Sequence, residues 1–222
     1  MILAIDTSTQ YLGIALYDGN QVLSERIWKS QRRHTAELAS VVKEMLEECG
    51  VQIQQLNTLA IAVGPGSFTS LRIGVVFAKG LCLALHLPII GIPSLDILAY
   101  SQPLQQLPLI CALLVGRKKF AAQDYVNEGG KWVSHTAIRL INVQELEQQI
   151  SCPSIVCGEF NEEERRILCR KWKTIILSSP ANSIRRPSFL AEMAWEQWQT
   201  NSIGDVVTLS PIYLHTVDSI PN

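Results

Sequence analysis

Short apolar stretches alternate with polar turns at the start of the chain, which is typical of β-strands. Such strands are expected at residues 2–6, 11–17 and 21–28. The Asp18-Gly19-Asn20 turn between the last two favours a tight hairpin. Over residues 35–49 the apolar positions instead recur at spacings of three and four and fall on one arc of a helix. The pattern predicts three antiparallel strands and an amphipathic helix that ends at Gly50.

The most distinctive stretch is a glycine-proline-glycine turn between a strand pattern and a long apolar helix. The strand is expected over residues 58–63, the turn is Gly64-Pro65-Gly66, and the helix over residues 71–85 carries only two charges, Arg72 and Lys79. Because the first N–H groups of a helix point into the loop before it, this geometry suits an anion. A helix that is apolar all round must also be buried all round, so its outer flank requires a second protein.

The second half of the chain repeats the plan of the first after a polar, proline-containing boundary at residues 102–108. Further strands are expected at residues 88–92, 109–115, 119–126, 132–141, 154–157, 206–209 and 211–214. Ser94 is expected to cap a short helix, and Pro187 to open a last one over residues 188–199. Two helix starts of the capping-box kind are expected, at Asn142 with Glu145 and at Asn161 with Glu164.

Together these elements predict an α/β fold of two lobes, with a duplicated mixed sheet flanked by helices. The plan resembles the actin-like ATPase (ribonuclease H-like) superfamily. The lobes are expected at residues 1–103 and 104–222, with the last helix and tail packing back toward the first lobe. The partner-binding helices are expected in the first lobe.

The composition restricts the class of protein. The 222 residues carry a formal net charge of −1, whereas a stand-alone nucleic-acid-binding protein usually has a clear basic excess. Residues 1–6 lack the basic start of a signal peptide, and residues 71–85 fall short of the roughly 20 residues that a membrane crossing needs. The six cysteines lie mostly in apolar segments, which indicates reduced thiols and a cytoplasmic protein. The four histidines are far apart along the chain, so we expect no metal site.

Three stretches resemble the TsaB family, the accessory subunit of the bacterial machinery that places a threonylcarbamoyl group on the adenosine beside the tRNA anticodon. They are residues 2–9, the block 59–74 with the following Ala78-Lys79-Gly80-Leu81, and residues 211–214. The similarity is dense over residues 1–100 and thin afterwards.

The resemblance implies a non-catalytic relative of a larger enzyme, TsaD, which binds a metal through a His-x-x-x-His pair. The two positions are Ser94 and Leu98 here, and neither is a good metal ligand. The chain departs from the family pattern at Ser70, where glycine is usual, at residues 113–117, which lack an aspartate, and at His215, where arginine is frequent. No nucleophile motif is visible, so no catalytic residue is assigned.

Two loops are candidates for binding a nucleotide. Their residues are Asp6, Thr7 and Ser8 after the first strand, and Gly64, Gly66 and Ser67 before the apolar helix. The first loop either faces a phosphate or forms a turn that satisfies its own backbone. The second either binds an anion or is a tight turn with a capped helix, since it lacks the Gly-Lys-Ser/Thr ending of a P-loop. Residues 156–159 have a similar strand-then-glycine form, for which we favour a plain strand end.

A partner surface is expected along the outer line of the apolar helix. Arg72, Val76, Lys79 and Leu83 recur there at spacings of four, three and four. The alternative is a core helix covered by the chain's own loops. Residues of the neighbouring helix are expected to complete the surface: Leu38, Val42 and Met45. Basic clusters are expected to be solvated surface, and the alternative is that they supply a few phosphate contacts in an assembly that acts on tRNA. They are Arg32-Arg33, Arg117-Lys118-Lys119, Arg165-Arg166 with Arg170-Lys171, and Arg185-Arg186.

The sequence therefore predicts a non-catalytic accessory subunit. The resemblance implies a TsaD-like catalytic paralogue as partner, a small TsaE-like ATPase recruited through that complex, and a self-dimer in the absence of the partner. Transfer RNA is expected to be reached only indirectly, and no membrane is involved. No cofactor is assigned, although ATP or ADP at the complex interface stays open. The alternative from another class is a stand-alone actin-like ATPase or small-molecule kinase that uses Asp6 and the glycine loops. A metalloprotease-like activity finds no ligand set.

Overall fold

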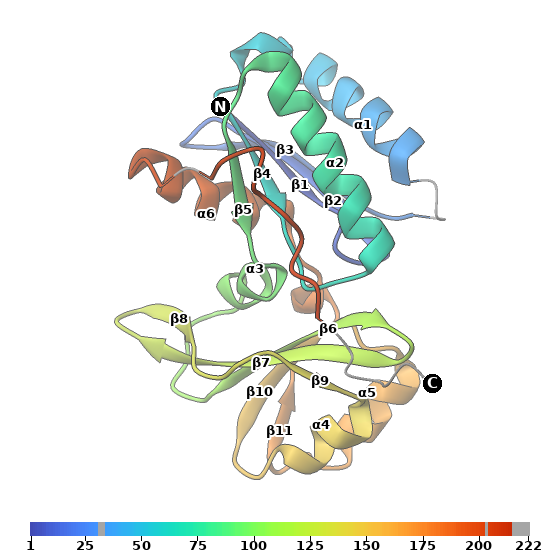
Figure 1. Ribbon diagram of the computed structural model, residues 1–222. Coiled ribbons are helices and arrows are strands. Elements are labelled where there is room, and N and C mark those ends of the chain that lie inside the picture. The colour runs from blue at the N-terminus through green and yellow to red at the C-terminus, as the bar shows by residue number, and fades with distance from the viewer. Residues whose placement is uncertain (31–33, 203, 215–222) are drawn as a thin grey trace.

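Two mixed β-sheets of similar plan form the framework of the protein (Figure 1). The structure, a computed structural model, describes residues 1–30, 34–202 and 204–214, and for residues 34–36 only the backbone. Arg32, Arg33 and His215, singled out in the sequence, lie outside the described residues.

The first sheet has the strand order β3-β2-β1-β4-β5. Its strands are β1 (Ile2–Asp6), β2 (Tyr11–Tyr17), β3 (Val22–Lys29), β4 (Thr58–Ala62) and β5 (Ile89–Ile92). The first three strands are antiparallel, and β4 and β5 run parallel to β1. The hairpin turn is confirmed. Gly19 has a positive φ of 105°, and the Asp18 carboxylate accepts hydrogen bonds from the backbone N–H groups of Asn20 and Gln21.

The second sheet repeats this arrangement in the order β11-β10-β6-β7-β8, with β9 paired to β7. Its strands are β6 (Leu109–Gly116), β7 (Lys119–Glu128), β8 (Lys131–Ser134), β9 (Arg139–Ile141), β10 (Ser154–Gly158) and β11 (Ile175–Leu177). β6 is antiparallel to β7 and parallel to β10, as β1 is to β2 and β4. The predicted duplication of a mixed sheet is confirmed.

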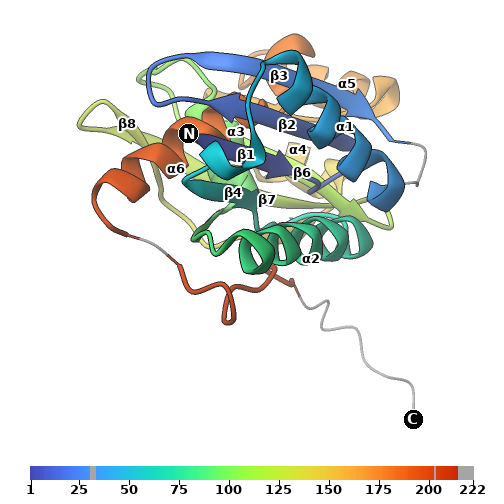
Figure 2. The same ribbon diagram turned by 90° about the horizontal axis from the view of Figure 1, so that it is seen from above.

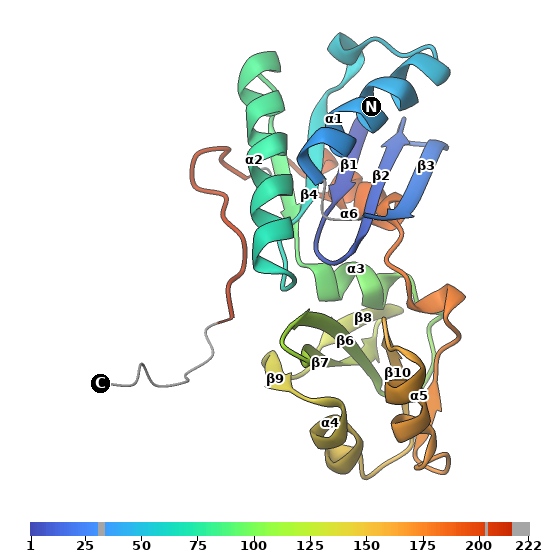
Figure 3. The same ribbon diagram turned by 90° about the vertical axis from the view of Figure 1, so that its right-hand side faces the viewer.

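Helices cover both sheets and separate them. They are α1 (His34–Glu48), α2 (Phe68–Leu85), α3 (Ser94–Tyr100), α4 (Val143–Gln149), α5 (Glu162–Cys169) and α6 (Pro187–Gln199), with short 3₁₀ turns η1 (Ile53–Gln55) and η2 (Ala181–Ser183). α1 and α2 pack on one face of the first sheet and α6 on the other, while α4 and α5 pack on the second sheet (Figures 1 and 3). α3 lies between the two sheets.

Alternation along the strands explains how one sheet serves two cores. Leu3 and Ile5 of β1 point to the α1–α2 side, whereas Ile2 and Ala4 point to α6. The short helix α3 also contributes to two cores. Ile97 packs in the core between the first sheet and α6, whereas Leu95, Leu98 and Ala99 pack against the second sheet. All five residues of β1 are buried, so burial alone does not distinguish one register of this strand from the next. The Asp6 turn at the end of the strand therefore helps to fix the register.

Local signals in the second half are mostly confirmed. Asn142 and Asn161 each cap a helix and accept a bond from the backbone of the glutamate three residues on, whose side chain bonds back. The six cysteines are free, as predicted, although Cys152 and Cys169 are exposed rather than in the core.

Three expectations about strands are wrong. The strand predicted at residues 132–141 is split into β8 and β9, because Asp124 bonds through its backbone to His135 and Thr136 and bends the chain between them. β11 was not expected at all. The predicted strands of the tail are absent from residues 204–214, which run beside α2 as turns and coil (Figures 1 and 2).

α2 is longer than predicted, with 18 residues. Among the described residues it is the one helix that is long and apolar enough to cross a membrane by length and composition, with a mean hydropathy of 1.6. A core helix passes the same test, and Leu71, Val75, Ala78 and Cys82 of α2 are buried against the first sheet.

Gly74→Ala is expected to lower the free energy of unfolding by about 1–3 kcal/mol, because the added Cβ would lie 2.1 Å from Thr7 Oγ1 behind β1. Gly80→Ala on the same helix meets nothing within 4 Å and is expected to raise that free energy by up to about 1 kcal/mol. Urea unfolding followed by circular dichroism measures both. Equal changes in the two variants would contradict the close approach of α2 to the end of β1.

Candidate functional site

The turn after β1 is buried and hydrogen-bonded within the protein. Asp6, Thr7, Ser8 and Thr9 are at most 3% exposed. One oxygen of Asp6 accepts from the Ser8 N–H at 2.8 Å, which is an Asx turn. The Thr7 hydroxyl donates to the backbone carbonyl of Ser70 at 2.8 Å and so ties the turn to the first turn of α2.

Arg185 is the centre of a buried ionic cluster at this turn. Its Nε donates to Asp6 Oδ2 at 2.8 Å, its Nη2 donates to Thr9 Oγ1 at 3.0 Å, and its Nη1 pairs with Glu159. Thr9 in turn donates to Glu159 at 2.8 Å. Burial alone would lower the pKa of Arg185, but the two carboxylates outweigh it and hold the pKa above its usual value.

This arrangement corrects one expectation. Arg185 was expected to belong to a surface cluster, but it is 3% exposed, whereas the neighbouring Arg186 side chain is 53% exposed and pairs with Glu25. No local pattern distinguishes the two arginines. The partners Asp6 and Glu159 lie 179 and 26 residues away along the chain, so only the folded structure brings them together.

The glycine loop closes onto the same turn. A Cβ at Gly66 would lie 2.1 Å from the Ser8 carbonyl oxygen, and the Ser67 N–H donates to that oxygen at 2.7 Å. The Gly64 N–H donates to the Ser94 hydroxyl at 3.1 Å, and the Ser8 and Ser94 hydroxyls are 2.5 Å apart. The structure thus brings together the residues predicted to bind a nucleotide, but these polar groups bond to one another.

An open cleft of about 550 Å³ lies beside this closed turn, between the lobes. It is lined by Thr9, Gln10, Ser30, Ser67, Thr69, Ser70, Ile73, Leu114, Val115, Gly116 and Glu159. Among the described residues, Glu159 is the only charged side chain in this lining, and it is paired with Arg185. No described cation lines the cleft to hold a triphosphate, which favours the interpretation of both loops as structural turns.

The two positions that correspond to a metal-binding pair are also buried. Ser94 is bonded to the glycine loop as described, and Leu98 packs between α3 and the second sheet. Within the part of the chain that the structure describes, no group of three or more histidine, cysteine, aspartate or glutamate side chains is placed to hold a metal ion.

The outer line of α2 is exposed, as predicted for Arg72, Val76 and Leu83. Val76 is 69% and Leu83 63% exposed, and the small residues Gly80 and Ala84 are exposed between and beside them. The sequence missed a third apolar member, because the helix starts three residues earlier than expected. Phe68 is 54% exposed and carries the Arg72 guanidinium 5.0 Å above its ring. We call Phe68, Arg72, Val76, Gly80 and Leu83 the α2 face.

Four other residues assigned to this surface lie elsewhere. Leu38, Val42 and Met45 of α1 are at most 4% exposed and form part of the core over the first sheet, so they cannot contact a partner. The sequence correctly placed these three residues on the apolar side of α1. That side faces the core because α1 has only one apolar side, and this side packs against the first sheet. The Nζ of Lys79 donates to the backbone carbonyl of Val207 at 2.9 Å. Lys79 therefore binds the tail of this chain and is not part of the open surface.

Comparison with known proteins places the chain in a family. The family model for tRNA N6-adenosine threonylcarbamoyltransferase, TsaD, matches residues 21–162. The tRNA threonylcarbamoyladenosine biosynthesis protein TsaB of Bacillus subtilis is 42% identical over 98 residues, which are 44% of this chain and 43% of that protein. The chain belongs to the TsaB family.

Other members of the TsaB family and a solved structure agree. TsaB of Buchnera aphidicola from Acyrthosiphon pisum is 27% identical over 153 residues, with 68% of this chain and 69% of that protein covered. The crystal structure of YeaZ from Pseudomonas aeruginosa has a TM-score of 0.76 and 20% identity, and the match covers 96% of this chain and 99% of that one. The fold is the two-lobed actin-like one. The aligned part spans less than half of the Bacillus subtilis protein's length.

Arg185→Met is expected to lower the free energy of unfolding by about 3–5 kcal/mol, because it leaves Asp6 and Glu159 buried without a counter-charge. Neutralising both acids in the same chain, as Asp6→Asn with Glu159→Gln, is expected to recover part of that loss. The exposed pair of Arg166 with Glu162 provides the control, and Arg166→Ala should change stability by less than about 0.5 kcal/mol. Urea denaturation measures all variants, and a small effect of Arg185→Met would refute a buried ionic cluster.

Proposed function

We propose that this protein is a non-catalytic accessory subunit in the biosynthesis of threonylcarbamoyladenosine in tRNA, and that it binds a TsaD-type catalytic paralogue through the α2 face. Its membership of the TsaB family supports the process. The observation that carries the mode of action is the exposure of three large apolar side chains, Phe68, Val76 and Leu83, in a row on one helix. An exposed apolar row of this kind is typical of a protein interface.

The chemistry of the α2 face suits another helix. Gly80 and Ala84 lack bulk, so a second helix backbone can approach closely between Val76 and Leu83. The described part of the tail, residues 204–214, contacts α2 through Val207 at Lys79 and through Tyr213 at Phe68, and it leaves Val76 and Leu83 open. Burying three such side chains contributes about 1.5–3 kcal/mol each.

The same face accounts for a self-dimer when the partner is absent. A two-fold contact places one α2 face on its own copy, so each apolar residue gains an apolar neighbour. The partner and the self-dimer would then compete for one surface. In the cytoplasm, the heterodimer would recruit a small TsaE-type ATPase, and the catalytic subunit would bring the tRNA to the chemistry.

The closed turn supports an accessory role rather than catalysis. The polar groups of the Asp6 turn and the glycine loop are bonded to each other, and Arg185 neutralises Asp6. A scaffold needs this rigidity, because the surface it presents is useful only when it is held in one geometry.

Val76→Glu combined with Leu83→Glu is expected to weaken binding to a TsaD-type protein by at least about 100-fold, since two carboxylates would be buried in an apolar contact. Calorimetry with the purified partner measures the affinity, and light scattering measures the self-dimer, which should also be lost. Both side chains are exposed in the free chain, so the melting temperature should be close to that of the wild type.

A matched control comes from the other lobe. Val133 on β8 is 40% exposed, and Val133→Glu adds one such charge away from the α2 face. It should leave the partner affinity unchanged. Equal affinity of the wild type and the α2 double variant would rule out the α2 face as the binding surface.

Binding of Mg-ATP by the isolated chain is expected to be weaker than about 1 mM, because no cationic side chain among the described residues lines the cleft and the loop donors are already bonded. Titration calorimetry tests this. Tight binding with turnover that disappears in Asp6→Ala would instead establish the stand-alone ATPase or kinase.

A further inference from the structure

The turn that follows α5 presents a tryptophan to solvent. Trp172 is 72% exposed and is the most exposed aromatic side chain among the described residues. It lies in Arg170-Lys171-Trp172-Lys173-Thr174, which we call the indole turn. Burying its ring would have stabilised the protein, so its exposure beside several cations makes this turn a candidate contact surface.

The indole turn is held firmly in place. The Lys171 Nζ donates to the backbone carbonyls of Glu147, Gln148 and Ile150, at 2.8, 3.4 and 3.4 Å, and so caps the end of α4. The N–H groups of Thr174 and Ile175 both donate to the Lys171 carbonyl, at 2.9 and 2.8 Å. Trp172 is therefore carried on a fixed turn, and little conformational entropy would be lost if a ligand met it.

The charges around the ring are positive. The Lys173 Nζ lies 5.4 Å from the centroid of the indole ring. Arg170 is exposed and forms no salt bridge within the described residues. A surface hollow of about 480 Å³ adjoins them, lined by Ile150, Ser151, Arg170, Lys171, Trp172, Lys173 and Thr174, with no carboxylate in the lining. Lys171 interacts with the negative C-terminal end of α4. The positive charges of Arg170 and Lys173 have no carboxylate partner in this lining.

We propose that the indole turn binds single-stranded RNA, with a base stacked on Trp172 and the adjoining phosphates held by Arg170 and Lys173. A base offers a flat apolar face to the indole, and the phosphates offer the negative charge that the two cations lack. The core of a protein interface would instead surround the indole ring with apolar residues. Here the residues before and after Trp172 in the chain are lysines. The inference rests on the proposed function, which makes an exposed tRNA segment the source of that RNA.

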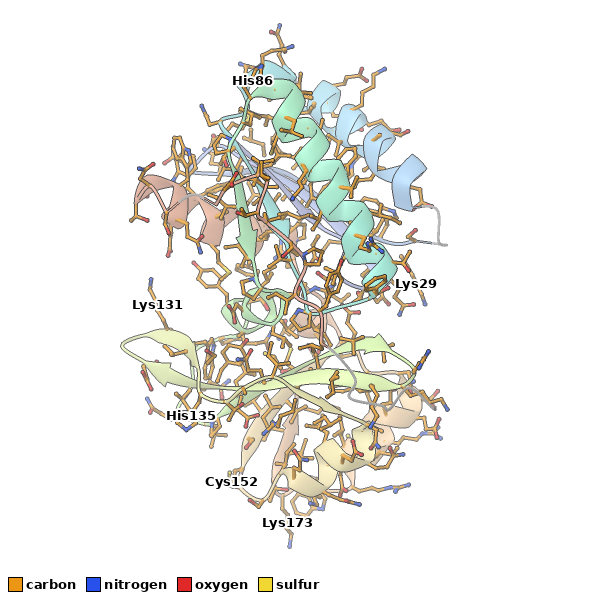
Figure 4. The ribbon with its side chains drawn as sticks, in the orientation of Figure 1. Lys29, His86, Lys131, His135, Cys152 and Lys173 are labelled. Atoms are coloured by element: carbon orange, nitrogen blue, oxygen red, sulfur yellow. The ribbon has the colours of Figure 1, made fainter. Side chains whose placement is uncertain are left out.

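The position of the indole turn allows both surfaces to be used at once. Lys173 lies at the far end of the second lobe, and His86, at the end of α2, lies at the opposite end of the molecule (Figure 4). A partner on the α2 face would leave the indole turn free. The sequence had suggested only indirect contact with tRNA, because neither the exposure of Trp172 nor the engagement of Lys171 is visible in a string of basic residues.

The full-length chain with fluorescently labelled tRNA, followed by anisotropy, tests the proposal. Trp172→Ala is expected to weaken binding by at least about 10-fold, and Trp172→Phe, which keeps a stacking face, by no more than about threefold. Arg170→Ala with Lys173→Ala should reduce the slope of log affinity against log salt by about 1.4, since each phosphate contact on a single strand contributes about 0.7. Lys43→Ala, an exposed lysine of the first lobe, is the control and should bind like the wild type.

One outcome would overturn the proposal: equal tRNA affinity for Trp172→Ala and the wild type. If Trp172→Ala then also binds the TsaD-type protein more weakly, the indole turn is a protein contact instead. Failure of the proposed function has a different signature: no complex with that protein forms, whichever residue occupies position 172. The α2 double variant should bind RNA like the wild type when tested alone.

Discussion

The Arg185 guanidinium joins the two lobes. It contacts the turn after β1 and Glu159, the residue after β10, and Arg185 itself lies just before α6. Two carboxylates share one cation, and this buried group is stable because Thr9 and the Ser8 N–H supply further hydrogen bonds. The cluster places two carboxylates and one cation where an actin-like fold would need room and free donors for a phosphate.

Closure of this turn fixes the position of α2. Gly66 and Gly74 let the glycine loop and the helix approach Ser8 and Thr7 so closely that no side chain fits between them. The inner side of α2 is thereby committed to the first sheet, and the described residues leave Val76 and Leu83 on its outer line exposed. The same contacts thus close the Asp6 turn and present apolar side chains of a helix at the surface, which is the physical argument for the proposed binding role.

The sequence predicted what depends on neighbouring residues and missed what depends on distant ones. The strands of the first sheet, the Asp18 hairpin and both capping boxes follow from local pattern and were confirmed. The position of Arg185 depends on two acids far away in the chain, and the inward orientation of Leu38, Val42 and Met45 depends on which side of α1 the sheet takes. The exposure of Val76 and Leu83 could be predicted because Arg72 marks their side of the helix, whereas Phe68 was missed with the helix start.

The two proposed surfaces lie on lobes that are held together at two points. α3 packs into both lobes, and Arg185 ties the lobes at a second point, so motion of one lobe relative to the other would break apolar contacts and ion pairs together. A surface held in this way loses little entropy on binding. The closed Asp6 turn and the fixed position of α2 are likewise two results of one set of contacts around that turn.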